Sequence, residues 1–139
     1  MTTVFLDTSY IIALETADDI NHDLTLKHWQ SFIQKLPRMV TTSYVFDEII
    51  TFFNSRNPHA KAVETGERLL SSPSVQFIHV DEILFFEGWR LFQQFDDKSY
   101  SLTDCISFVV MTQLGIRTAL SFDKHFVQAG FEKLPYKKE

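Results

Sequence analysis

Two aspartates follow predicted strands and a third lies in the first turn of a predicted helix. Asp7 closes the run Val4-Phe5-Leu6, Asp123 follows the apolar segment 118–121 by two residues, and Asp104 lies in the first turn of a helical pattern. Acids beyond the carboxyl ends of parallel strands lie where open α/β sheets bind ligands. Carboxylates gathered there repel one another unless a divalent cation is bound, and Mg²⁺ or Mn²⁺ prefers oxygen ligands. Such a cation lowers the pKa of an attacking water and stabilises a leaving oxygen, which is the chemistry of phosphodiester hydrolysis.

Each of these aspartates also has a purely structural interpretation. Asp7-Thr8-Ser9 is typical of a helix start, because such side chains cap free N–H groups. Ser101-Leu102-Thr103-Asp104 is close to a capping box, with Asp in place of the usual Glu or Gln. Thr103 could act as a cap or orient a water or phosphate, and Asp123 could cap the short turn after it. Residue types alone therefore leave capping and cation binding open.

A fourth acid is ambiguous by position. The segment 43–54 predicts a helix with one broad apolar face, and Glu48 lies at one rim of that face while Asp47 lies at the other. A rim carboxylate is more often a solvated charge than a ligand. Periodicity does not separate the two residues.

The elements that must position these acids alternate between strands and helices. Strands are expected at 3–6, 38–41, 75–80, 117–121 and, at an edge, 131–134; helices at 8–16, 22–36, 43–54, 59–70, 82–95 and 101–114, with a helical turn at 123–127 and a cap at Asn57-Pro58. This alternation favours a mostly parallel sheet of four or five strands with helices on both faces. Gly88 weakens the pattern of its helix and so predicts a close packing contact there.

Composition indicates an ordinary globular chain of one domain, residues 1–139, with 45% hydrophobic and 22% charged residues. No apolar run approaches the about 18 residues of a membrane span, and no basic segment precedes an apolar one, so we expect a cytoplasmic protein without membrane contact. The net charge of −5 disfavours general binding to phosphate backbones. That objection weakens if four acids surround a cation. Fourteen Phe indicate a Phe-rich core or a self-association surface.

Four blocks carry a resemblance to a known family. The segments 6–14 (LDTSYIIAL), 42–48 (TSYVFDE), 100–108 (YSLTDCISF) and 120–126 (LSFDKHF) resemble, in order, the four acidic blocks of PIN-domain ribonucleases, especially the small VapC-type toxins. The resemblance selects Glu48 rather than Asp47. The carboxylate set it implies, for both catalysis and metal binding, is Asp7, Glu48, Asp104 and Asp123. Thr8 and Thr103 could support these ligands, and Thr8 and Ser9 would then cap the first helix.

The same resemblance sets further expectations. It implies a three-layer α/β/α sandwich and Mg²⁺- or Mn²⁺-dependent cleavage of structured or single-stranded RNA, tRNA included. It also implies a homodimer and neutralisation by a small antitoxin protein.

The same residues also allow functions other than a PIN-domain ribonuclease. A non-catalytic PIN-like module that binds RNA or protein would keep the acids as caps and surface charge. A receiver domain requires paired acids after an early strand, and an Asp-x-Asp phosphatase is excluded because Ser9 takes the second position. The five histidines show no paired ligand spacing. Lys124 and His125 could contact a substrate phosphate, although a solvated surface pair is the preferred interpretation. Cys105 is interpreted as a buried thiol rather than a nucleophile.

Overall fold

The computed structural model describes residues 2–56 and 58–137. Its strands are β1 (Thr3–Leu6), β2 (Arg38–Thr42), β3 (Val75–Ile78), β4 (Thr118–Leu120) and β5 (Glu132–Leu134). Its helices are α1 (Thr8–Glu15), α2 (His22–Phe32), the short 3₁₀ helix η1 (Ile33–Lys35), α3 (Ser43–Arg56), α4 (His59–Ser71), α5 (Glu82–Gln94), α6 (Leu102–Leu114) and α7 (His125–Gln128). Within these residues, no helix combines the length and the apolar character needed to span a membrane.

The strands form a single five-stranded sheet in the order β3-β2-β1-β4-β5, and all the described pairings are parallel. The mostly parallel sheet expected from the sequence is confirmed, including β5 as an edge strand. β1 is central, with Leu6 opposite Leu120 of β4. The carboxyl ends of β1 and β4 therefore lie side by side, although more than a hundred residues separate them in the chain.

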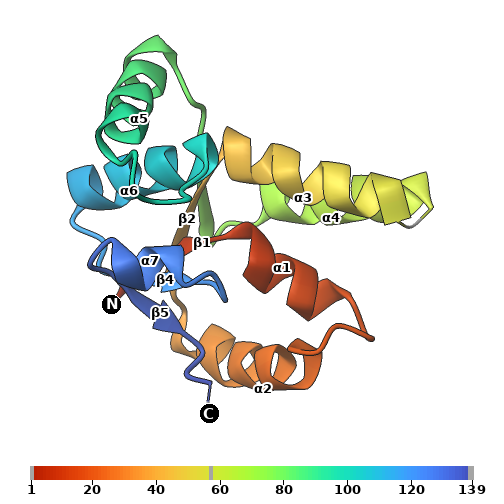
Figure 1. The fold of residues 1–139 in the computed structure, drawn as a ribbon. Coiled ribbons are helices and arrows are strands. Elements are labelled where there is room, and N and C mark those ends of the chain that lie inside the picture. The colour runs from red at the N-terminus through yellow and green to blue at the C-terminus, as the bar shows by residue number, and fades with distance from the viewer. Residues whose placement is uncertain (1, 57, 138–139) are drawn as a thin grey trace.

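Helices cover both faces of this sheet. Because crossovers between parallel strands are right-handed, the connections β1–β2 and β2–β3 place α1 to α4 on one face, and the return to β4 and on to β5 places α5 to α7 on the other. Figure 1 shows these two helical groups on opposite sides of the strands. The expected three-layer sandwich is confirmed.

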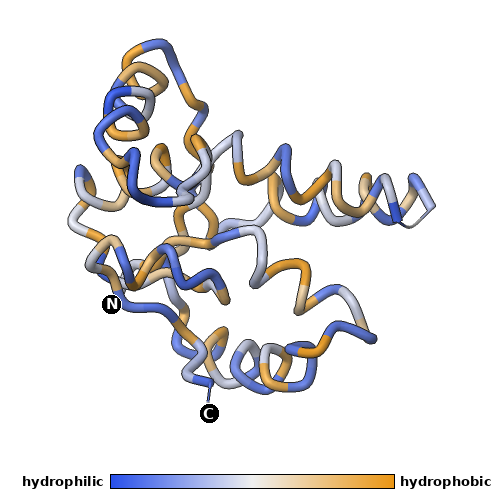
Figure 2. The backbone as a smooth tube through the Cα atoms, viewed as in Figure 1, coloured by the Kyte–Doolittle hydropathy of each residue, from blue (hydrophilic) through white to orange (hydrophobic). Residues whose placement is uncertain are grey.

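The core consists of the central strands and the inward faces of the helices. Phe5, Leu6 and Leu120 are fully or almost fully buried, and Phe126 of α7 packs beneath them against Phe5. Figure 2 shows hydrophobic and hydrophilic residues alternating in short stretches along α3 and α4, as amphipathic helices require. The buried core includes Phe5, Phe32, Phe53, Phe108 and Phe126, whereas Phe86, Phe92 and Phe95 are exposed.

Most predicted helix ends lie within two residues of the observed ones, but the end of the second helix and the start of the fourth differ in kind. The predicted helix 22–36 ends at Phe32 and continues as η1, and Leu36 then adopts φ 51° before Pro37. The ring of a proline disfavours the α conformation in the preceding residue, so the helix ends early. For the fourth helix, Asn57 lies outside the described residues, and Pro58 immediately precedes α4 rather than lying in its first turn.

Gly88 confirms the close contact predicted for its helix. A Cβ atom added there would lie 2.4 Å from Cγ1 of Ile106, so α5 approaches α6 more closely than any side chain allows. This contact holds α6, whose first turn carries Asp104, against the rest of its layer.

Candidate metal centre

Asp7 lies where β1 ends and α1 begins, with only 6% of its surface exposed. Its main-chain N–H donates to the carbonyl of Leu120 at 3.1 Å, which fixes the position of the residue relative to β4. The hydroxyls of Ser121 and Ser9 donate to Oδ2 of its carboxylate at 2.7 and 3.2 Å. Both hydroxyls thus serve one oxygen, and Oδ1 remains without a hydroxyl donor among the described residues.

The two serines are themselves fixed by main-chain groups of the loop after β4. Ser9 Oγ accepts the N–H of Phe122 at 2.8 Å, and Ser121 Oγ accepts the N–H of Asp123 at 2.9 Å. The hydroxyl protons are therefore free to point at Asp7. The sequence had suggested Thr8 and Ser9 as helix caps, and that interpretation is wrong, because Ser9 binds Asp7 and the loop.

The electrostatics of Asp7 oppose its ionised form. The pKa of Asp7 is raised to about 6. Burial is the largest cause and the negative charges of Asp104 and Asp123 add to it, while the hydrogen bonds from Ser121 and the N–H of Thr8 act in the opposite direction. Within the described ranges, no Lys or Arg nitrogen lies within 4 Å of a carboxylate oxygen of Asp7, Glu48, Asp104 or Asp123. The negative charge at this position is thus poorly compensated by the protein.

Asp104 combines the two roles considered from the sequence. It closes a capping box at the start of α6, in which Ser101 Oγ accepts the N–H of Asp104 and Asp104 Oδ2 accepts the N–H of Ser101, each at 3.0 Å. The same Oδ2 lies 2.9 Å from Nδ1 of His125. The cap therefore fixes this carboxylate and aims it at α7.

Asp123 lies beside Asp104, as the sequence predicted from strand ends. Its Oδ1 accepts the main-chain N–H of His125 at 2.9 Å, so Asp123 stabilises the turn that leads into α7, whose N-cap is Lys124. One potential ligand atom from each of Asp104, Asp123 and His125 lies within 4.8 Å of the others. These three residues form the most compact group of potential metal ligands in the described part of the chain.

The position of His125 corrects an expectation. Lys124 is exposed, but only 15% of the His125 side chain is exposed, and its ring contacts both aspartates. The solvated pair expected from the sequence is therefore wrong for His125. The sequence did not predict this contact, because a histidine two residues after Asp123 resembles no paired ligand motif. The position of the His125 ring depends on how α7 packs beside the start of α6.

Glu48 reaches the site from α3 at its rim. Its Oε1 accepts a hydrogen bond from the Thr8 hydroxyl at 2.7 Å. Partial desolvation raises the pKa of Glu48, the bond from Thr8 lowers it, and the charges of Asp104, Asp47 and Asp123 raise it. The side chain is nevertheless among the exposed ones, so water still screens its charge.

The two threonines proposed as supports differ in this structure. Thr8 contacts Glu48 directly, as expected for a supporting residue. For Thr103, the main-chain carbonyl accepts a hydrogen bond from the hydroxyl of Ser107, while the Thr103 side chain makes no hydrogen bond among the described residues.

Cys105 is fully buried, and burial together with the charge of Asp104 raises its pKa to about 11, so its thiol stays protonated at neutral pH.

The donor set fits a hard divalent cation. The structure groups Asp104 and Asp123 closely, whereas Asp7 and Glu48 lie outside that group and interact with it through their charges. Among the described residues, no Lys or Arg forms an ion pair with any of the four. Oxygen ligands of this kind suit Mg²⁺ and Mn²⁺, and the positive charge of a bound cation would favour the ionised form of Asp7, which burial and the neighbouring acids disfavour.

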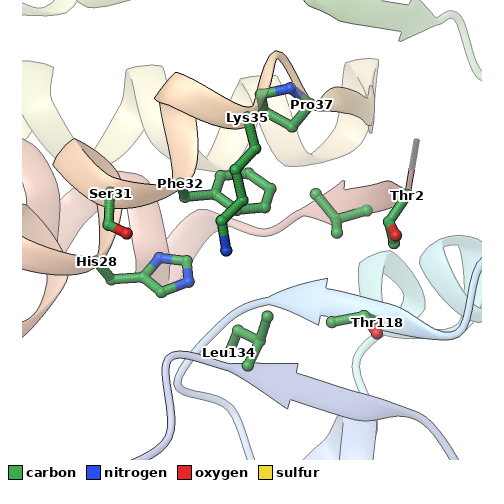
Figure 3. A pocket seen from close by; sticks show the side chains of 9 residues that line it. Thr2, His28, Ser31, Phe32, Lys35, Pro37, Thr118 and Leu134 are labelled. Carbon is green, nitrogen blue, oxygen red and sulfur yellow. The ribbon is translucent and has the colours of Figure 1, made fainter.

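A separate cavity of about 350 Å³ lies away from these acids (Figure 3). Its walls include His28, Phe32 and Lys35 from α2 and η1, and Thr118 from the start of β4. None of the four carboxylates lines it. This cavity is therefore not part of the candidate metal site.

The sequence model of the PIN domain family matches residues 4–132. The chain belongs to the PIN domain family. This PIN domain is 36% identical over 128 residues to the 23S rRNA-specific endonuclease VapC20 of Mycobacterium tuberculosis, which covers 92% of the chain and 95% of the relative. The resemblance seen in the four acidic blocks is confirmed at the level of the family.

Solved structures agree with this assignment. The crystal structure of M. tuberculosis VapC20, described as a sarcin-ricin loop cleaving toxin, matches with a TM-score of 0.83 and 34% identity, over 92% of this chain and 95% of that one. VapBC2 from Rickettsia felis, bound to a DNA fragment from its promoter, matches with a TM-score of 0.70 over 96% of this chain and 98% of that one. At 11% identity, this second likeness supports the fold alone.

Proposed function

We propose that this PIN domain is a divalent-metal-dependent endoribonuclease and the toxin of a toxin–antitoxin pair. The observation that supports the proposal is the close pair Asp104 and Asp123, whose charges also act on the buried Asp7 and on Glu48, in a PIN domain whose described residues include no Lys or Arg ion-paired with these acids. A non-catalytic module would have no need to bury Asp7 against other acids, since that placement raises the free energy of the metal-free fold.

Asp7, Glu48, Asp104 and Asp123 are the residues that would hold the cation or cations, Mg²⁺ or Mn²⁺. When bound, such a cation lowers the pKa of a water that attacks the phosphodiester and stabilises the leaving oxygen. The chain supplies fixed carboxylates for this purpose. Ser9 and Ser121 orient Asp7, the main-chain N–H of Ser101 orients Asp104, and Thr8 orients Glu48.

The substrate class we propose is structured RNA of the large ribosomal subunit. The support is the 36% identity to a relative named for 23S rRNA-specific cleavage, over nearly the whole length of both chains. The net charge of −5 fits a site in which bound cations, rather than Lys and Arg, meet the phosphate backbone. Since the substrate is RNA, we propose a cytoplasmic location.

The proposed partners are a second copy of the chain and a small antitoxin protein. Both follow from the resemblance to VapC-type toxins. An uninhibited ribonuclease would damage its own cell, and a basic side chain inserted among the four carboxylates would block the site.

Co-expression with the neighbouring open reading frames, followed by purification of the PIN domain, should recover a small co-purifying chain. Unimpaired growth of cells expressing the PIN domain alone at high level would contradict toxicity.

Sequencing of RNA 5′ ends tests the enzymatic proposal. The purified chain is incubated with ribosomal RNA and Mg²⁺ or Mn²⁺, and new ends should appear at a defined position in the large rRNA. Chelator and Asp7→Asn should both abolish them, whereas Asp18→Asn, which removes the same charge from an exposed turn, should not. Equal cleavage by Asp7→Asn would refute the mechanism.

A further inference from the structure

One ring nitrogen of His125 faces two carboxylates at once. Its Nδ1 lies 2.9 Å from Oδ2 of Asp104 and 3.2 Å from Oδ1 of Asp123. A single Nδ1 proton can be donated fully to only one of these oxygens. A cation in contact with all three atoms would satisfy both carboxylates and the ring nitrogen together.

The separations suit shared coordination. In an octahedral shell with metal–ligand bonds of about 2.1 Å, adjacent ligand atoms lie about 3 Å apart. The distances from Nδ1 to the two oxygens fall near that value. One potential ligand atom from each of the three residues also lies within 4.8 Å of the others.

The other side of the ring has the partner that a metal ligand needs. Nε2 of His125 lies 3.2 Å from Oγ of Ser99, which can accept its proton. Metal-binding histidines donate their second N–H to such a partner, which leaves the first nitrogen deprotonated toward the metal. The ring is also held edge-on against Tyr100, with centroids 5.3 Å apart, and the following residue, Phe126, is fully buried.

We propose that His125 is a nitrogen ligand of the cation bound by Asp104 and Asp123, so that this PIN domain has a mixed oxygen and nitrogen site that favours Mn²⁺ over Mg²⁺. This inference rests on the proposed metal-dependent function and adds the identity of one ligand and the preferred metal. Imidazole binds transition metals well, whereas Mg²⁺ favours oxygen and water. Replacing His125 should therefore weaken Mn²⁺ binding more than Mg²⁺ binding.

Pulsed electron paramagnetic resonance of the Mn²⁺-loaded full chain measures this directly. A nitrogen ligand produces a ¹⁴N hyperfine coupling, and the native chain should show it. The coupling should persist in His59→Gln, an exposed histidine on α4, and should be absent in His125→Gln. In titrations, His125→Gln should raise the Mn²⁺ dissociation constant about 10- to 100-fold and change that of Mg²⁺ by a smaller factor.

The outcomes separate this inference from the proposed function. One outcome would overturn the role of His125 and leave the nuclease proposal intact. In it, Mn²⁺ binds the native chain and Asp7→Asn weakens that binding, but the spectrum of the native chain shows no directly bonded nitrogen. Absence of Mn²⁺ binding to the native chain would contradict both. Circular dichroism establishes whether His125→Gln is folded; if it is not, His125→Asn takes its place, and the native spectrum alone still decides whether nitrogen is bound.

Discussion

Asp7 meets opposite requirements for folding and for cation binding. Its burial beside Asp104 and Asp123 raises its pKa to about 6, so at neutral pH the metal-free fold holds an ionised carboxylate that the surroundings disfavour. A bound cation would offset this cost, because its positive charge attracts the ionised carboxylate. The placement of Asp7 therefore lowers the stability of the metal-free fold and would favour cation binding.

This conflict gives a pH dependence with a defined sign. Between about pH 4 and pH 6, the folded chain retains a proton on Asp7 that the unfolded chain has lost. The protonated Asp7 therefore contributes fully to the free energy of unfolding below about pH 4, and this contribution is lost as the pH rises through about 6. Asp7→Asn should therefore be more stable than the native metal-free chain at pH 8, by up to about 3 kcal/mol. Urea unfolding with chelator at pH 5 and pH 8 measures the difference.

The two hydroxyl donors make Asn an appropriate replacement, because its side-chain carbonyl can still accept from Ser9 and Ser121. The stability gap should be about half as large at pH 5, should close below about pH 4, and should reverse when saturating Mn²⁺ is added to both proteins. A variant that is less stable than the native chain at pH 8 without metal would show that Asp7 has a structural role instead.

Thr8 offers a test of a supporting residue. Its hydroxyl is the donor that holds Glu48, and Val has the same shape without the donor. Thr8→Val should lower the cleavage rate about 10-fold and change the free energy of unfolding by less than about 1 kcal/mol, while Thr8→Ser should restore activity. Full activity of Thr8→Val would mean that Glu48 needs no such support.

At this scale, the sequence predicted the aspartates but not their neighbours. Asp7, Asp104 and Asp123 could be placed because each follows a strand or begins a helix, and those positions share one sheet edge. The roles of Ser9, Ser121 and His125 depend on contacts between segments far apart in the chain, so no local spacing signals them. Glu48 was separated from Asp47 by family resemblance alone.

At the scale of elements, the contact between α5 and α6 depends on one missing methyl group. A Cβ at position 88 would overlap Cγ1 of Ile106 at 2.4 Å, and the core beneath Ile106 is fully buried. Gly88→Ala should therefore destabilise the fold by about 1–2 kcal/mol, because overpacking outweighs the about 1 kcal/mol gained in helix propensity. Chemical denaturation measures this difference.

A double-mutant cycle assigns the effect to that contact. With Ile106→Ala already present, adding Gly88→Ala should cost less than it does alone, since the overlapping atom is gone. Gly66→Ala provides the comparison, because its added Cβ would lie 3.0 Å from the flexible end of Ile50 and should be better tolerated. Equal costs at Gly88 and Gly66 would contradict the packing argument.

Most elements were predictable because their signals are local. Gly115 ends α6 at φ 68°, and Asp81 caps α5 by accepting from the N–H of Leu84, both as turn and cap chemistry require. The end of α2 was misplaced because apolar spacing continued to Leu36, while the constraint of Pro37 on its predecessor decided the backbone. The strand order was not predictable, since it is set by packing between distant segments.

At the scale of the whole molecule, α5 presents an apolar row that the described chain leaves exposed. Ile83, Phe86, Trp89 and Phe92 lie along it, and Trp89 and Phe92 stack with centroids 5.7 Å apart. If the proposed homodimer uses this face, light scattering after size exclusion should give a dimer mass for the native chain. Trp89→Glu should then shift the mass toward the monomer, whereas Ile20→Glu, at an exposed turn, should not. An unchanged dimer in Trp89→Glu would place the interface elsewhere.

The rate of rRNA cleavage in Mn²⁺ by single amide variants tests whether the four carboxylates form the cation site. Asp7→Asn, Glu48→Gln, Asp104→Asn and Asp123→Asn should each lower the rate more than about 100-fold while remaining folded, because each removes a charge from the proposed cation site. Asp47→Asn and Asp18→Asn, which lower the charge equally at exposed positions, should cleave like the native chain. Native rates in Asp7→Asn or Glu48→Gln, or an equal loss in the two controls, would contradict the assignment of the site.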